Sequence, residues 1–302
     1  MTFSRVYIAG SGGMLGAAVY AHFKDIAEVR ASDLSPRESW LRTVDVGAYD
    51  QFYDDVADFG PDLLINLAAQ TDLEFCEHNP DFAWHCNALG AENGGLIANQ
   101  LDIPYVYIST AGIFGGERAT YLDYHEPNPL TVYAQSKFYG ERFVERAVRK
   151  YFVLRAGWMM GGGPSLDKKF INKLYSQLVA GERKLYAVTD KLGTPTYTKD
   201  FARGIEVVAS SGLYGVYNQV CSGLGSRYDV ARHFVTCLGL DDSVEVVPVE
   251  SSHFATEYFA ERPASEQLLN AKLSSRGINV MRDWREALAD YSEEFPTEGL
   301  RR

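Results

Sequence analysis

The sequence predicts an α/β protein with a doubly wound, mostly parallel sheet and a smaller C-terminal lobe. Three observations lead to this prediction. A glycine-rich turn joins a short β-rich run to a helix near the N-terminus, strand-like runs then alternate with helical patterns, and the pattern changes beyond residue 160. Strands that alternate with helices form parallel sheets with both faces covered. We therefore expect one domain over residues 1–160, to which some later segments return, and a smaller α/β lobe over 161–302.

The first strand, turn and helix have the pattern of a dinucleotide site. Residues 6–9 form a β-rich run, 10–16 read Gly-Ser-Gly-Gly-Met-Leu-Gly, and a helical pattern continues to Phe23. In a Rossmann-type domain the first glycine makes the tight turn, the second lets the backbone approach a pyrophosphate, and the third allows close helix–strand packing. The spacing is Gly-x-x-Gly-x-x-Gly, and Gly12 also supplies the commoner form. The predicted cofactor residues here are Gly10, Gly13, Met14, Leu15 and Gly16.

An acidic residue follows the second predicted strand, 28–32. Asp33 lies 17 residues beyond Gly16, where a carboxylate can hydrogen-bond the adenosine ribose. That position favours NADH, although Arg37 could meet the 2′-phosphate of NADPH, so both cofactors stay open. Asp33 as a loop or helix cap is the alternative. We expect Asp45 and Val46 to approach the adenine, with an ordinary loop aspartate as the alternative reading.

Two later strands are expected to end at the same site. The apolar run 63–65 leads into a segment in which Ala68 and Ala69 leave room for a ligand at the sheet edge. The strand 105–108 delivers Thr110, whose hydroxyl could bond a substrate carbonyl or simply cap the strand end. The polar, turn-rich segment 115–129 is predicted to be a loop over the site.

The helical pattern over 131–150 carries the predicted chemistry. Tyr133 and Lys137 are four residues apart, so their side chains lie on one face of the helix. A nearby ammonium lowers the pKa of a phenol, and a phenol tuned in this way is a usable general acid. The alternative is a core tyrosine beside a solvated lysine.

The remainder reads as the smaller lobe, which we expect to close over a substrate. Helices are predicted over 168–180, 200–210, 228–238 and 284–291, with short strands at 216–218 and 244–247. Arg262 is the best candidate for binding a phosphate through its planar guanidinium, with a surface salt bridge as the alternative.

Composition excludes several classes. The 302 residues include 40 acidic and 29 basic side chains, a net charge of −11, which argues against a nucleic-acid partner. No apolar run approaches the ~18 residues of a membrane span. We expect no signal peptide, because residues 1–5 run straight into a short strand. The four cysteines lack metal-like spacing, so we expect no metal site and reduced thiols in a cytoplasmic protein. A homodimer is compatible with these features.

Together these residues resemble the extended short-chain dehydrogenase/reductases, and within them the dTDP-4-dehydrorhamnose reductase family. The resemblance covers nearly the whole chain. Its motifs are the glycine turn at 10–16, residues 62–71 with Glu77, Asn87, residues 107–110 with Phe114, Tyr133-x-x-x-Lys137, Arg155-x-x-Trp158, residues 193–196, and Arg262-Pro263 followed by Leu268 or Leu269.

The resemblance implies a reductase that uses NADH or NADPH on a nucleotide-linked 4-keto-6-deoxy sugar. Tyr133 would protonate the keto oxygen as hydride arrives from the nicotinamide. Lys137 would bind the ribose hydroxyls and lower the pKa of Tyr133, and Thr110 would hold the carbonyl. Asp33 and the glycine turn would hold the dinucleotide beside Ala68 and Ala69. The sugar-nucleotide side would include Thr71, Trp158 and Arg262.

One departure from the family pattern bears on the substrate. The family usually continues Ser-Thr-Asp-Tyr-Val-Phe, where this chain has Ser-Thr-Ala-Gly-Ile-Phe at 109–114. The missing carboxylate and ring leave the identity of the sugar open. Two alternatives therefore remain, an NAD-dependent nucleotide-sugar epimerase or dehydratase and a non-catalytic nucleotide-binding regulatory subunit.

Overall fold

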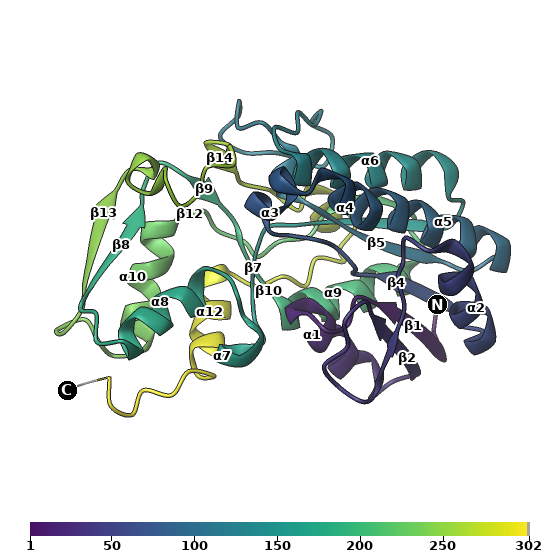
Figure 1. Ribbon diagram of the computed structural model, residues 1–302, viewed down its shortest axis with the longest axis horizontal. Helices are drawn as coiled ribbons and strands as arrows, with labels where there is room; N and C mark the ends of the chain where they lie inside the picture. The colour runs from purple at the N-terminus through teal and green to yellow at the C-terminus, as the bar shows by residue number, and fades with distance from the viewer. Residues whose placement is uncertain (301–302) are drawn as a thin grey trace.

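A seven-stranded sheet in which every strand pair is parallel forms the larger part of the molecule, in a computed structural model that describes residues 1–300 (Figure 1). The strand order is β11-β6-β5-β4-β1-β2-β3. Along the chain, β2 and β3 are therefore added on one side of β1, and β4, β5, β6 and β11 on the other. The strands are β1 (Arg5–Ala9), β2 (Glu28–Asp33), β3 (Leu41–Thr43), β4 (Leu63–Asn66), β5 (Tyr105–Thr110), β6 (Tyr151–Ala156) and β11 (Gly215–Asn218).

Helices cover both faces of this sheet, which confirms the predicted doubly wound fold. Alternate side chains of β1 point to opposite faces, so that Val6 and Ile8 join one apolar cluster and Tyr7 and Ala9 join another. One face carries α1 (Met14–Phe23) and α9 (Thr198–Ser211). The other carries α2 (Tyr49–Phe59), α5 (Gly90–Leu101) and α6 (Val132–Ala147). The chain enters α5 through α3 (Leu73–His78), α4 (Pro80–Trp84) and a π-helical turn, η1 (His85–Leu89), and a 3₁₀ turn, η2 (Ala111–Ile113), follows β5.

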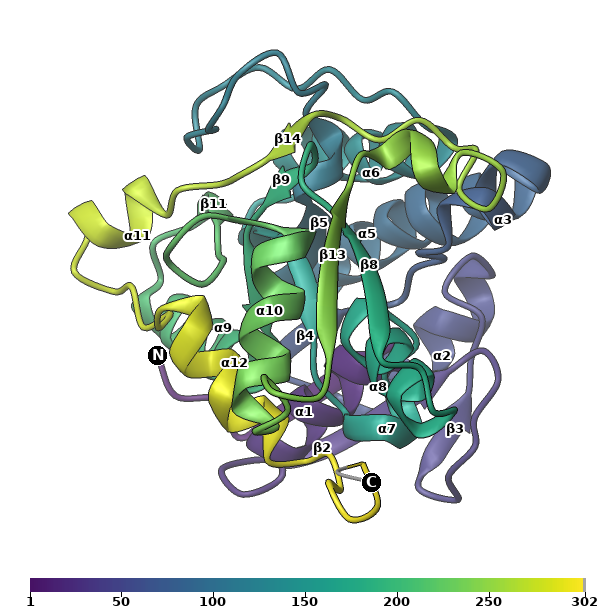
Figure 2. The same ribbon diagram turned by 90° about the vertical axis from the view of Figure 1, so that its left-hand side faces the viewer.

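The smaller part has its own layer of helices against a two-stranded parallel sheet (Figure 2). Leu185, Phe234, Tyr291 and Phe295 belong to its buried core. Its main elements are α7 (Gly163–Leu166), α8 (Phe170–Val179), β8 (Lys184–Val188), α10 (Arg227–Cys237), β13 (Glu245–Val249) and α12 (Trp284–Ser292). The remaining elements are short: β7 (Trp158–Met160), β9 (Leu192–Gly193), β10 (Pro195–Tyr197), β12 (Gly225–Ser226), η3 (Ser251–Phe254), β14 (Ser265–Glu266) and α11 (Ala271–Ser275).

Two expectations from the sequence need correction. The helix and strand predicted at 200–210 and 216–218 are part of the larger domain and not of the smaller lobe. The helix α9 packs on α1, and β11 pairs in parallel with β6. A parallel strand needs a crossover, and α9 provides it. The segment 115–129 does not cover the site: none of its residues lines the cleft described below, and Gly116 reaches only Pro263 and Ala264 at the margin of that cleft. Within residues 1–300 no helix combines the length and the apolar character that crossing a membrane requires.

Candidate active site

The carboxyl ends of β1, β2, β4 and β5 open into a cleft of about 1650 Å³, which the smaller part closes from the other side. It lies where the strand order reverses between β1 and β4, the position at which open α/β sheets bind ligands. Every site residue predicted from the sequence lines this one cleft. They are Gly10, Gly13, Met14, Leu15, Gly16, Asp33, Asp45, Val46, Ala68, Ala69, Thr71, Thr110, Tyr133, Lys137, Trp158 and Arg262. The role of each residue stays a prediction.

The glycine turn has the geometry that a dinucleotide cradle needs. Gly10 has a φ of +79°, and a Cβ there would lie 2.4 Å from the amide nitrogen of Ala68. A Cβ at Gly16 would lie 2.4 Å from the Cα of Ser11. Gly13 caps the start of α1, and nothing lies within 4 Å of its Cβ position. Two of these glycines are therefore required by packing, whereas Gly13 leaves open space at a helix N-terminus, which suits a phosphate.

This contrast gives a first prediction. Gly16→Ala should destabilise the fold by about 1–3 kcal/mol, because the methyl group meets backbone that cannot move aside. Gly13→Ala should cost less than about 1 kcal/mol in stability but weaken NADPH binding at least tenfold, since its methyl group occupies the phosphate space. Urea denaturation and fluorescence titration with NADPH separate the two effects. Equal NADPH affinity in Gly13→Ala and the unmodified protein would contradict the cradle assignment.

Asp33 is anchored to the glycine turn. Its Oδ2 accepts a hydrogen bond of 2.9 Å from the Gly12 amide, and its Oδ1 accepts one of 3.0 Å from the Ser35 amide. The carboxylate keeps further lone pairs that can accept from ribose hydroxyls. Both carboxylate oxygens of Asp45 already have partners within the protein. One lies 2.9 Å from His85 Nε2, and the other accepts from the Gly47 amide at 2.8 Å.

Hydrogen bonds fix α6 against the strand ends. The Asn87 side chain accepts from the Gln70 amide at 2.9 Å, and donates to the Gln70 carbonyl at 3.1 Å and to Ser136 Oγ at 3.0 Å. Thr131 caps α6 by accepting from the Ala134 amide at 3.2 Å. These bonds hold the first turns of α6, which carry Tyr133 and Lys137, next to the loop after β4.

Tyr133 and Thr110 lie together in the cleft. Burial raises the pKa of Tyr133 to about 12, while a hydrogen bond from Thr110 acts in the opposite direction and the Glu266 carboxylate raises it further. The direction differs from the lowered pKa that the sequence suggested, because desolvation of the phenolate outweighs other effects. Thr110 also accepts from the Gly112 amide at 3.1 Å, which orients its hydroxyl.

Lys137 is a buried cation. Its side chain is nearly inaccessible to solvent, with a residue exposure of 3%. Its Nζ lies 4.1 Å from the centre of the Tyr107 ring, and no carboxylate within residues 1–300 forms an ion pair with it. Burial lowers the pKa of Lys137 to about 7. The nearby Glu141 is instead paired with Arg155 at 2.5 Å.

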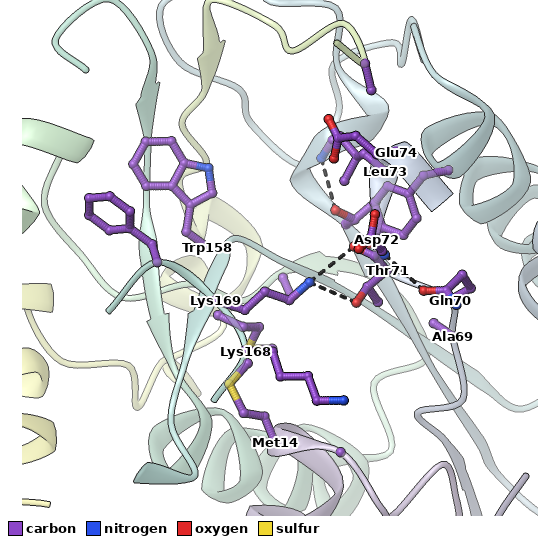
Figure 3. A pocket seen from close by; sticks show the side chains of 18 of the residues that line it. Met14, Ala69, Gln70, Thr71, Asp72, Leu73, Glu74, Trp158, Lys168 and Lys169 are labelled. Carbon is purple, nitrogen blue, oxygen red and sulfur yellow. Dashed lines mark hydrogen bonds between the residues drawn. The ribbon is translucent and has the colours of Figure 1, made fainter. Parts of the chain in front are cut away.

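Three residues that the sequence did not single out also line the cleft. Lys169 donates to the side chain and carbonyl of Thr71 at 3.0 and 3.2 Å, and Figure 3 shows it reaching toward Thr71 across from Trp158. The guanidinium of Arg227 lies 3.7 Å from the centre of the Trp158 ring, and Glu266 accepts from the Trp158 indole at 2.8 Å. No local spacing marks these three residues, because each comes from a different distant segment.

Arg262 differs in part from its expected role. Its two terminal nitrogens lie 2.8 and 3.0 Å from the Glu74 carboxylate. The salt bridge that the sequence left as an alternative is therefore present, although Arg262 also lines the cleft. The guanidinium of Arg227 has no such carboxylate within 4 Å among residues 1–300, and burial lowers its pKa to about 10.

The sheet order, the reversal at β1 and β4 and the glycine turn define a Rossmann-type α/β protein. The chain belongs to the RmlD substrate binding domain family, whose model matches residues 4–296. This confirms the family resemblance seen in the sequence and makes the chain a member of a nucleotide-sugar reductase family.

Individual relatives align over most of their length. The chain is 30% identical to dTDP-4-dehydrorhamnose reductase of Mycolicibacterium smegmatis, covering 95% of this chain and 84% of that protein. It is 29% identical to the spore coat polysaccharide biosynthesis protein SpsK of Bacillus subtilis, with 96% and 98% covered. It is also 29% identical to methionine adenosyltransferase 2 subunit beta of Xenopus tropicalis, with 91% and 83% covered. The crystal structure of dTDP-4-dehydrorhamnose reductase from Bacillus anthracis in complex with NADP superposes with a TM-score of 0.88 at 27% identity, covering 97% and 100%.

Proposed function

We propose that this protein is an NAD(P)H-dependent reductase of a nucleotide-linked 4-keto-6-deoxy sugar, similar to dTDP-4-dehydrorhamnose reductase and acting in deoxysugar biosynthesis. The observation that carries the proposal is the meeting of Thr110, Tyr133 and Lys137 in one cleft with the glycine turn. The open space at Gly13 and the anchored carboxylate of Asp33 fit a dinucleotide. The relative from Bacillus anthracis, which was solved with NADP, supports the same choice of cofactor class.

The residues of the cleft account for the proton transfer in this reaction. Bound NADH or NADPH supplies the hydride. Tyr133 gives a proton to the keto oxygen, and a pKa of about 12 keeps its phenol protonated at neutral pH, as a proton donor must be. The Thr110 hydroxyl donates to the same oxygen and orients the carbonyl. Lys137 binds ribose hydroxyls and stabilises the phenolate that forms as the proton leaves.

Cations in the cleft suit the diphosphate of a sugar nucleotide. Arg227 and Lys169 form no ion pair among residues 1–300, so their charge is available to an anion, whereas that of Arg262 is shared with Glu74. Trp158 lines the cleft beside these cations, with the Arg227 guanidinium over its ring and its indole N–H bonded to Glu266.

The test is NADH or NADPH oxidation with a panel of dTDP-linked 4-keto-6-deoxyhexoses. We expect turnover with at least one sugar, which depends on both the cofactor and the enzyme. A characterised reductase assayed in parallel shows that each sugar preparation is competent. No turnover with any nucleotide-linked keto sugar, while that control is active, would reject the proposal.

A regulatory subunit is the second candidate, because methionine adenosyltransferase 2 subunit beta has 29% identity over nearly the whole chain. Cofactor binding without reductase activity, together with a copurifying partner enzyme, would favour it.

A further inference from the structure

The turn after β5 lines the cleft with residues that have little or no side chain. Thr110 is followed by Ala111, which is buried, and by Gly112, which has no side chain. Both residues follow the hydroxyl that we assign to the substrate carbonyl, and both line the cleft. The residues of this turn therefore supply no polar side chain to bind the sugar.

A carboxylate from a distant part of the chain lies at this position. A Cβ at Gly112 would lie 3.3 Å from Oε1 of Glu266 and 3.4 Å from Oγ1 of Thr110. Any side chain larger than that of glycine would therefore press against Glu266. The charge of Glu266 also raises the pKa of Tyr133, in keeping with a position close to the phenol. Glu266 thus shares one small region of the cleft with Thr110 and Tyr133.

Glu266 is held firmly in this place. Its Oε2 accepts from the Trp158 indole nitrogen at 2.8 Å. Glu266 pairs with Gly193 between β14 and β9, and a Cβ on Gly193 would lie 2.2 Å from the Trp158 ring, so the indole packs directly on that glycine. Among residues 1–300, no donor hydrogen-bonds to Oε1 of Glu266. One oxygen is therefore fixed, and the other faces the cleft as a free acceptor.

We infer that Glu266 is a specificity-determining residue, whose Oε1 accepts a hydrogen bond from a hydroxyl on the carbon next to the keto carbon of the sugar. The inference rests on the proposed function. Thr110 and Tyr133 bind the keto oxygen, so the substituent beside the keto carbon is the group that comes nearest to Glu266. A site built to bond a hydroxyl discriminates strongly against a sugar without one, because the buried acceptor is then left unpaired.

The experiment compares two sugars and three proteins. The sugars are dTDP-4-keto-6-deoxyglucose and its 3-deoxy counterpart, and the proteins are the unmodified chain, Glu266→Gln and Glu286→Gln. Glutamine can keep an oxygen toward the Trp158 N–H, so the local fold should persist. Glu286 is the control, because it is exposed on α12 and does not line the cleft.

We expect the unmodified protein to prefer the 3-hydroxyl sugar at least tenfold in kcat/KM. Glu266→Gln should lose about ten- to hundredfold on that sugar and little on the 3-deoxy sugar, the range for a hydrogen bond to a charged group. Its NADPH affinity should not change, and Glu286→Gln should behave as the unmodified protein. Equal losses on both sugars would indicate a merely structural role and overturn the inference.

The outcomes separate the two proposals. An active enzyme whose sugar preference is unchanged in Glu266→Gln rejects the role of Glu266 and leaves the reductase proposal standing. An enzyme inactive on every sugar rejects the reductase proposal. In that case calorimetric titration with dTDP-glucose decides on Glu266: weaker binding by Glu266→Gln supports sugar recognition, and equal or absent binding overturns it.

Discussion

Replacing Tyr133 with phenylalanine should reduce turnover by about 10²–10⁴-fold, the usual contribution of a positioned general acid. The phenol hydrogen-bonds with the Thr110 side chain, and its raised pKa keeps it protonated across the physiological range. Phenylalanine preserves the ring and removes only the hydroxyl, so the packing of α6 should persist. Because the glycine turn and Asp33 lie on other elements, NADPH affinity should stay within about threefold of the original value.

Steady-state kinetics and a fluorescence titration with NADPH measure the two quantities. Tyr139→Phe is the matched control, since Tyr139 is on the same helix but is 56% exposed. It should keep full activity. A Tyr133→Phe protein that reduces substrate at nearly the original rate would show that the proton comes from another group. A large loss of NADPH affinity would show instead that the hydroxyl serves binding.

The parts of the site that the sequence predicted depend on local geometry. The glycine turn follows from a strand, a turn and a helix in direct succession, and Tyr133 and Lys137 share a face because α6 repeats every 3.6 residues. Thr110 and Ala68 could be placed because the ends of parallel strands meet at one edge of the sheet. The sequence thus predicted the fold class, and every site residue that it named lines the cleft.

What the sequence did not reveal depends on contacts between distant segments. Glu266 reaches the space beside Gly112 only because β14 pairs with β9, and Arg227 reaches Trp158 only through the start of α10. The direction of the Tyr133 pKa shift was also missed, because spacing shows which charge is near but not how deeply the phenol is buried. The return of α9 to the large sheet is a similar long-range effect.

Replacing Lys137 with methionine should make the protein more stable and less active. The ammonium is buried without a carboxylate partner, and burial lowers its pKa from 10.5 to about 7. At a pH between those values the unfolded chain binds more protons than the folded one, so stability rises with pH. Below pH 7 the lysine is charged in both states, and the full cost of burying it is present. Methionine removes that cost and keeps a long apolar side chain.

We expect Lys137→Met to gain about 1–2 kcal/mol of unfolding free energy near pH 6, without added cofactor. The gain is limited because the contact with the Tyr107 ring is lost. It should shrink as the pH rises from about 7 toward 10.5, as the lysine loses its proton in the folded state. Turnover and NADPH affinity should both fall at least tenfold, because the ribose hydroxyls and the developing phenolate lose their cation.

Urea denaturation at a series of pH values, together with kinetics and NADPH titration, tests this trade of stability for function. Lys24→Met removes a charge from an exposed position and should change stability by less than about 0.5 kcal/mol at every pH. If Lys137→Met were less stable than the original protein near pH 6, the Lys137 ammonium would have to make an interaction that stabilises the fold. A gain in stability with unchanged kinetics would instead mean that its charge serves neither the cofactor nor Tyr133. The predicted combination requires a cation that the fold tolerates at a cost, because the chemistry in the cleft depends on it.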